Sequence, residues 1–167
     1  MTIQKTDVTD DTLQSRYLLF GLGDEVYGVP IRNVTEIIGM QPVNTLPEAT
    51  TYIKGVVNLR GKIIPVIDMR LRFKKPEAPY TDRTCIVVVE TQCFSAGLIV
   101  DEVDEVLVIE ERDIAPPPKL NIGIGNRYLS GIGKVNGKVK LLLDCEVLFN
   151  EEETKQMEHA KTGGSKT

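Results

Sequence analysis

Two segments of this 167-residue chain repeat each other, and this repeat constrains the fold more than any other feature. Residues 55–68 align with residues 131–144, at an offset of 131 − 55 = 76 positions. A leading glycine, a Gly-Lys turn and a closing aspartate coincide in the two copies, and most apolar positions match. A second pair, residues 28–37 and 97–106, repeats in the same order at an offset of 97 − 28 = 69. Two ordered matches indicate a duplicated structural unit.

The turns inside the longer repeat predict β-hairpins. Asn136-Gly137 is a strong two-residue hairpin signal, because both central positions of such a turn need positive φ. Arg60-Gly61 is a weaker example of the same turn. Gly55 and Gly61 are expected to be structural residues, needed for the backbone geometry. Since a lone hairpin cannot bury its apolar face, we expect each half to close into a small barrel without exposed strand edges.

Short apolar runs separated by glycines continue along the body of the chain, which is typical of a mostly β barrel or sandwich. Helical patterns are sparse: we expect one or two turns over residues 69–73 and a short C-terminal helix from about residue 144. The segment 151–161 is compatible with a continuation of that helix. The expected strands cover residues 16–20, 26–29, 56–59, 63–67, 86–89, 96–100, 106–109 and 139–143.

The polar ends of the chain predict a flexible N-terminal tail over residues 1–15 and a polar C-terminal tail over residues 151–167. We expect two subdomains between them, at about residues 16–80 and 81–150, joined by the proline-containing linker 74–79. A half of about 65 residues is marginal alone, whereas the whole chain can bury roughly 70% of its unfolded surface. The chain is therefore expected to be either one compact unit or two small units that share a core.

Composition excludes several classes of partner. The net charge is −4, from 20 Lys and Arg against 24 Asp and Glu, and phosphate binding needs a concentrated basic face, so no nucleic acid is expected. The start lacks the apolar core of a signal peptide, and no apolar run approaches the roughly 20 residues that span a bilayer. We expect a cytoplasmic protein without direct membrane insertion. Cys85, Cys93 and Cys145 have no paired spacing and indicate reduced thiols, with Cys85 and Cys145 buried.

Residues for common catalytic and metal sites are missing from the body of the sequence. The one histidine, His159, lies in the polar C-terminal segment, which leaves no Ser-His or Cys-His pair. Without a Cys-x-x-Cys spacing, no metal or cofactor is expected. The glycine pairs at 21–23 and 123–125 lack the third glycine of a nucleotide loop and indicate β-turns. The acidic run 101–106 lacks the calcium-loop pattern and indicates a solvated face.

The segment YIKGVVNLRGKIIPVIDMR, residues 52–70, resembles the signature stretch of the CheW family. Residues 27–37, 97–103 and 128–133 resemble further landmarks of that family, so the resemblance covers residues 16–150. It implies two SH3-like five-stranded β-barrels packed around a shared hydrophobic core.

The resemblance also implies a non-catalytic adaptor of chemotaxis signal transduction. The implied partners are the regulatory domain of the histidine kinase CheA and the cytoplasmic tip of methyl-accepting chemotaxis receptors. Such an adaptor is cytoplasmic and is recruited to membrane receptor arrays.

An adaptor without reactive groups acts by presenting surface, and a groove between two barrels suits an amphipathic receptor helix. Arg60 is the leading partner-binding candidate, because a hairpin turn does not need a long cationic side chain to fold. We expect it to pair with Glu36 through its guanidinium fork. The apolar candidates, each of which could instead belong to the core, are Val34, Ile37, Val57, Leu59 and Val103.

Two alternatives remain at this point. One is a scaffold module that binds a kinase outside chemotaxis. The other is a small cofactor-free hydrolase that uses Asp68 or Glu36, since paired carboxylates about 5 to 10 Å apart across a cleft can perform hydrolysis.

Overall fold

The computed structural model describes residues 15–45, 52–92, 94–117 and 128–148. These residues form two β-sheets and little helix, as the sequence predicts. The first sheet, sheet A, consists of β1 (Arg16–Leu22), β2 (Glu25–Pro30), β8 (Glu102–Val108), β9 (Ile114–Ala115), β10 (Leu129–Val135) and β11 (Lys138–Leu143). The second sheet, sheet B, consists of β3 (Val34–Gly39), β4 (Ile53–Leu59), β5 (Lys62–Asp68), β6 (Cys85–Glu90) and β7 (Ser95–Val100).

The helical elements are single turns. They are α2 (Met69–Arg72) and the 3-10 turns η2 (Ile31–Asn33), η3 (Glu111–Asp113) and η5 (Cys145–Val147). The turn expected over residues 69–73 is therefore confirmed, and η5 stands where the short C-terminal helix is expected to begin. The two predicted tails lie outside the described residues apart from Ser15.

Strand order shows that the duplication is structural. Sheet B runs β3-β6-β7-β5-β4, and sheet A runs β8-β1-β2-β11-β10-β9, so the first five strands of each sheet correspond one to one. The registers agree as well. Val66 pairs with Gly97 in one parallel contact, and their repeat equivalents Leu142 and Gly28 pair in the other. Both hairpins even carry a register shift at the same place, between Ile53 and Gly55 and between the equivalent residues of β10.

The two hairpin turns have the predicted geometry. Arg60 and Gly61 have φ of 53° and 85°, and Asn136 and Gly137 have φ of 51° and 76°. Positive φ at both central residues matches the right-handed twist of the flanking strands. The structural role expected of these turn residues is thereby supported by the backbone.

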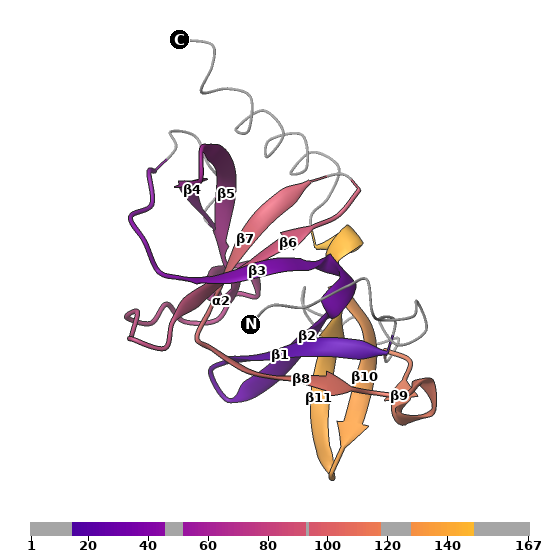
Figure 1. Cartoon of the computed structure of the whole chain (residues 1–167). Coiled ribbons are helices and arrows are strands. Elements are labelled where there is room, and N and C mark those ends of the chain that lie inside the picture. Colours follow the sequence, from indigo (N-terminus) through magenta and orange to yellow (C-terminus); the bar gives the residue numbers. More distant parts are fainter. Residues whose placement is uncertain (1–14, 46–51, 93, 118–127, 149–167) are drawn as a thin grey trace.

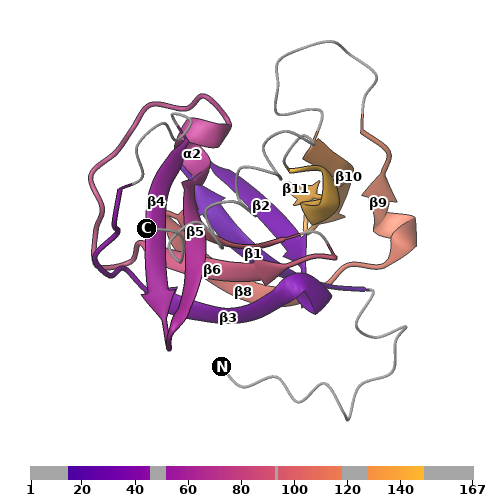
Figure 2. The same ribbon diagram turned by 90° about the horizontal axis from the view of Figure 1, so that it is seen from above.

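The two sheets are not the two halves of the sequence. Strands β1 and β2 from the first half pair with β8 and β11 from the second half, while β6 and β7 from the second half pair with β3 and β5 from the first. Each sheet therefore combines the first hairpin of one repeat with the remaining strands of the other. Sheet A takes β1–β2 from the first repeat, and sheet B takes β6–β7 from the second. The expected division near residue 80 does not follow the sheets, and Figures 1 and 2 show the interleaving by colour.

Strand β6 explains how the two sheets share a core. Its residues alternate between two hydrophobic clusters: Val87 and Val89 belong to the large cluster shared by both sheets, and Ile86 and Val88 belong to a smaller cluster within sheet B. A strand buried on both faces is expected to be continuously apolar, which explains the β-branched run in β6. The shared cluster supplies the common core that the resemblance implies.

Candidate functional site

The Arg60 face, formed by Glu36, Leu59 and Arg60, lies where sheet B closes on itself. Strands β3 and β4 are the two edges of that sheet. Arg60, in the β4–β5 turn, forms an ion pair with Glu36 of β3, as predicted from the sequence. Asn44 and Val56 exchange backbone hydrogen bonds of 2.8 Å and continue the closure.

Arg60 has an unusual backbone for its residue type. Its φ of 53° places it in the left-handed region, where a residue with a Cβ is strained by about 1–2 kcal/mol. Asparagine tolerates this region well, and Asn136 occupies the equivalent position of the other hairpin. The arginine side chain is 72% exposed, whereas that of Glu36 is 26% exposed. The left-handed turn position thus displays an exposed cation. Lys74, with φ of 58°, is a second basic residue in this region, so the exposure of Arg60 and its pair with Glu36, rather than its backbone alone, make it the candidate.

Ile37 belongs to a different surface. Cross-strand partners share a face of a sheet, and Ile37 pairs with Val87 of the shared core, whereas Glu36 pairs with Val88 of the inner cluster. Ile37 therefore points to the side where sheet B packs on sheet A. It is 38% exposed, which is high for a large hydrophobic side chain. We call the exposed edge of β3 at Ile37, beside Val87 of the shared core, the Ile37 rim.

The remaining apolar candidates are less accessible. Val34 and Val57 are buried, at 4% and 1% exposure, so the core assignment applies to them. Leu59 is half-buried and packs against the inner cluster of sheet B. Val103 lies on β8 in sheet A, half-buried against the shared core, and does not join the Arg60 face.

The two acids of the hydrolase alternative are held apart by β5. Glu36 contacts the turn that precedes β5, and Asp68 ends that strand. Seven residues of strand span about 20 Å, which exceeds the separation that paired catalytic carboxylates need. Asp68 is buried and accepts hydrogen bonds from the backbone N–H of Arg70 at 2.9 Å and from the Tyr80 hydroxyl at 3.0 Å. Its role is to cap α2.

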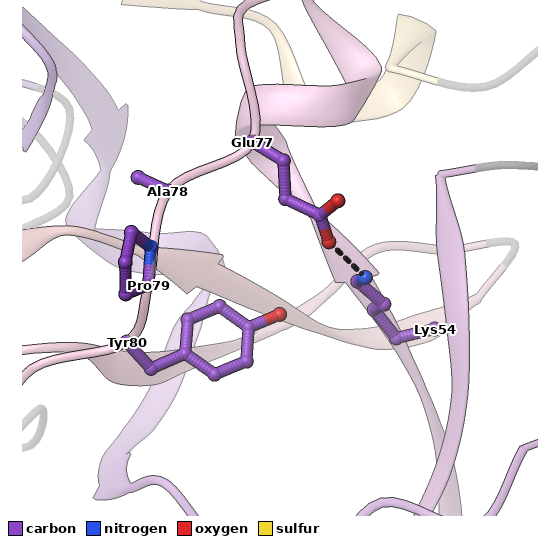
Figure 3. Close-up of a pocket in the computed structure, with 5 residues that line it drawn as sticks. All are labelled: Lys54, Glu77, Ala78, Pro79 and Tyr80. Carbon is purple, nitrogen blue, oxygen red and sulfur yellow. Dashed lines mark hydrogen bonds and ion pairs between the residues drawn. The ribbon is translucent and has the colours of Figure 1, made fainter.

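A pocket of about 360 Å³ lies beside the linker that follows α2 (Figure 3). Lys54 Nζ and Glu77 Oε1 form an ion pair of 2.7 Å across it, and Pro79 and Tyr80 form its other wall. The two charged side chains that line the pocket are thus paired with each other. The linker is thereby fastened to β4 rather than extended freely.

Two structural arginines, Arg70 and Arg72, could not be predicted from the sequence, because they lie in the charged segment RLRFKK, residues 70–75, which is typical of an exposed surface. Arg70 forms a bidentate pair with Asp101, through Nε–Oδ1 at 2.8 Å and Nη2–Oδ2 at 2.6 Å. This pair holds the pKa of the Asp101 carboxyl below its usual value. Asp101 therefore belongs to a structural contact instead of the solvated face expected for 101–106. Arg72 is buried, and the position of Tyr52 and Tyr128 at equivalent sites of the repeat is the signal that could have revealed it.

The cysteines show no reactive environment in the part of the chain that the structure describes. Cys145 is buried as predicted, and burial raises the pKa of its thiol to about 12. Cys85 is only half-buried, contrary to the prediction, and this partial burial also raises its pKa. Cys93 lies outside the described residues.

Among the described residues, no group of three or more His, Cys, Asp or Glu side chains could hold a metal ion. None of the helices within the described ranges has the length and apolar character to cross a membrane.

Comparison with known proteins identifies the family. The CheW-like domain matches residues 16–153, nearly the whole described body. The chain belongs to the CheW family. It is 35% identical over 143 residues to the chemotaxis protein CheW of Klebsiella aerogenes, covering 86% of each chain. It is 31% identical over 148 residues to the CheW of Treponema pallidum, covering 86% of this chain and 87% of that one.

A solved structure of the CheW family has the same architecture. The scaffolding protein TtCheW from Thermoanaerobacter tengcongensis superposes with a TM-score of 0.77 at 35% sequence identity, covering 84% of this chain and 95% of that chain. The recognition of the CheW family from residues 52–70 is thus confirmed. The mostly β fold of two SH3-like subdomains is confirmed with it.

Proposed function

We propose that this CheW-family chain is a non-catalytic adaptor that couples methyl-accepting chemotaxis receptors to the histidine kinase CheA. Its partners are the cytoplasmic tip of the receptors and the regulatory domain of the kinase. It works in the cytoplasm at the receptor arrays. The family relationship supports this function, because the relatives are named for chemotaxis and the structural relative for scaffolding.

The observation that carries the proposal is the exposed Arg60. A strained hairpin position displays a guanidinium that is 72% exposed and that already lies against Glu36. An exposed ion pair contributes only about 0 to 1 kcal/mol to folding, so stability alone does not explain this arrangement. A partner that covers the pair removes water from it, and the same contact then becomes stronger because the local dielectric constant falls.

Two separate faces support simultaneous binding of two partners. The Arg60 face offers a cation and half-buried Leu59 at the closed edge of sheet B. The Ile37 rim offers an apolar side chain on the opposite face of β3, beside the shared core. An amphipathic helix laid along such a rim buries its apolar face there. Because the two faces do not overlap, each can take its own partner.

The test is calorimetric titration of the purified chain with the CheA regulatory domain and, separately, with a receptor-tip fragment. Arg60→Ala and Ile37→Asp should each weaken binding of at least one partner by tenfold or more, about 1.4 kcal/mol, while circular dichroism shows a folded protein. Val139→Asp is the matched control, because Val139 is 55% exposed on the β10–β11 hairpin of the other sheet. Unchanged affinities in both variants would contradict the proposal.

A further inference from the structure

Arg72 occupies the contact between the two sheets. It ends α2, directly after sheet B, and its side chain is buried at 9% exposure. Its guanidinium carbon lies 4.4 Å from the centre of the Tyr52 ring and 4.5 Å from the centre of the Tyr128 ring. Tyr52 precedes β4 of sheet B, and Tyr128 precedes β10 of sheet A. The cation is thus held between one aromatic ring from each side of the molecule.

Hydrogen bonds fix the same guanidinium to sheet A. Arg72 Nε and Nη2 donate to the carbonyl oxygen of Leu148 at 3.1 and 2.9 Å, and Nη2 also donates to the Tyr128 hydroxyl. Leu148 follows β11 and is fully buried. The repeat offset of 76 relates Tyr52 to Tyr128 and also Arg72 to Leu148. Arg72 therefore lies where the two copies of the repeat meet.

Burying a cation in this position is costly. Removal of a charge from water costs several kcal/mol, and an apolar side chain of similar volume often stabilises a core equally well. The surrounding cluster of both sheets is apolar, and apolar contacts have no preferred direction. A planar guanidinium with a forked set of donors, stacked on two rings, is strongly directional. The directional contacts of Arg72 therefore constrain how the two sheets are oriented where they meet.

We infer that Arg72 is a positioning residue that fixes the orientation of sheet A relative to sheet B. Ring contacts extend this joint into sheet A: Phe73 lies 5.9 Å from Tyr128 and 5.1 Å from Tyr27 between ring centres. The inference deepens the proposed function, which needs two partner faces in one fixed arrangement. Its test uses the isolated chain, so it stands or fails separately from partner binding.

The test is a distance measurement by double electron–electron resonance between nitroxides at positions 62 and 138. These exposed lysines are repeat equivalents on the tips of the two long hairpins. An introduced ketone amino acid carries the labels, which leaves the cysteines untouched. The wild-type chain should give one narrow distance distribution. Arg72→Lys keeps the charge but loses the fork and the flat stacking surface, so its distribution should become roughly twofold wider.

Two further variants keep the test decisive. Tyr128→Phe keeps the ring and removes only the hydroxyl acceptor, so it should broaden the distribution by less than Arg72→Lys, and it can be measured even if Arg72→Lys does not fold. Val88→Ala loosens the inner cluster of sheet B without touching the joint, and it should leave the width unchanged. A folded Arg72→Lys chain with a distribution as narrow as that of the Val88→Ala control would overturn the inference. If Arg72→Lys does not fold, an equally narrow Tyr128→Phe distribution would overturn it.

Discussion

Arg60 and Asn136 occupy the same position of two copies of one hairpin, but only Arg60 carries a charge. Both have left-handed backbones, with φ of 53° and 51°. Asparagine suits that conformation, whereas arginine does not. The hairpin of sheet B therefore has arginine at a position whose backbone suits asparagine better, and this Arg60 side chain forms the pair with Glu36.

This difference between the hairpins predicts the behaviour of Arg60→Asn. The substitution relieves the backbone strain and removes an exposed ion pair, so the free energy of unfolding should stay within about 1 kcal/mol of the wild-type value. Affinity for the partner that uses the Arg60 face should fall by tenfold or more. Urea unfolding and calorimetric titration measure the two quantities. A variant that binds both partners as tightly as the wild type would show that the strained arginine does not serve binding.

Among the glycines that the structure describes, Gly55 is the one whose replacement should be most damaging. A Cβ at this position would lie 2.1 Å from the carbonyl oxygen of Asn44, and the φ of 149° is strained for other residues. Gly55→Ala should therefore lower the free energy of unfolding by about 2 kcal/mol or more. Gly39→Ala is the control, since nothing lies within 4 Å of its added Cβ. Equal stability of the two variants in urea titrations would contradict the packing described at Asn44.

At this scale, the local turn residues could be predicted from the sequence. The turn glycine Gly61 could be predicted because the conformation of a two-residue hairpin turn depends on its own residues. The pair of Arg60 with Glu36 joins residues 24 positions apart, and the sequence suggested it through their opposite charges. Burial could not be predicted for Val34 and Val57, since a valine in a strand has the same local pattern at the rim as in the core.

Among the secondary-structure elements, the Arg70–Asp101 pair connects segments that are distant in the chain. Asp101, at the junction of β7 and β8, also accepts the backbone N–H of Gly23 in the β1–β2 turn at 2.8 Å. Arg70, on α2, also donates to the carbonyl oxygen of Pro76 in the linker at 3.1 Å. One ion pair thereby fastens the β1–β2 hairpin, α2 and the linker together.

This pair predicts a pH-dependent contribution to stability. The pKa of Asp101 is lower in the folded chain, so its contribution is complete above the unfolded value of about 3.9 and is lost as the pH falls through the folded pKa. Asp101→Asn should lower the free energy of unfolding by about 1 kcal/mol at pH 7. The difference from the wild type should shrink below about pH 4. Urea titrations at several pH values measure it, and a difference independent of pH would contradict the ion-pair account.

Most strands could be predicted, but β3, β9 and β10 lie outside the expected ranges. Strand partners could not be predicted. Turn residues and apolar runs revealed the hairpins, because those signals are contained within a few residues. The pairing of β2 with β11 joins residues more than 110 positions apart, and no sequence pattern in either strand identifies its partner. The repeat implies that both sheets pair their strands in the same way, but this could be seen only when the registers of the two sheets were compared.

At the scale of the whole molecule, the interleaved sheets make the two halves dependent on each other. Residues 1–80 alone lack β6 and β7, the middle strands of sheet B, and residues 81–167 alone lack β1 and β2. Each half should therefore be largely unfolded alone, because its strands have unpaired edges and an open core. An equimolar mixture should regain β-structure by circular dichroism. Cooperative unfolding of either half alone would contradict this topology.

The central claim is that this chain of the CheW family holds two proteins at once without performing chemistry. Sedimentation velocity of the chain mixed with the CheA regulatory domain and a receptor-tip fragment tests it most directly. We expect one faster boundary that contains all three components, and Arg60→Ala or Ile37→Asp should remove one partner from it. Displacement of one partner by the other would show that they compete for a single face, and the claim would be contradicted.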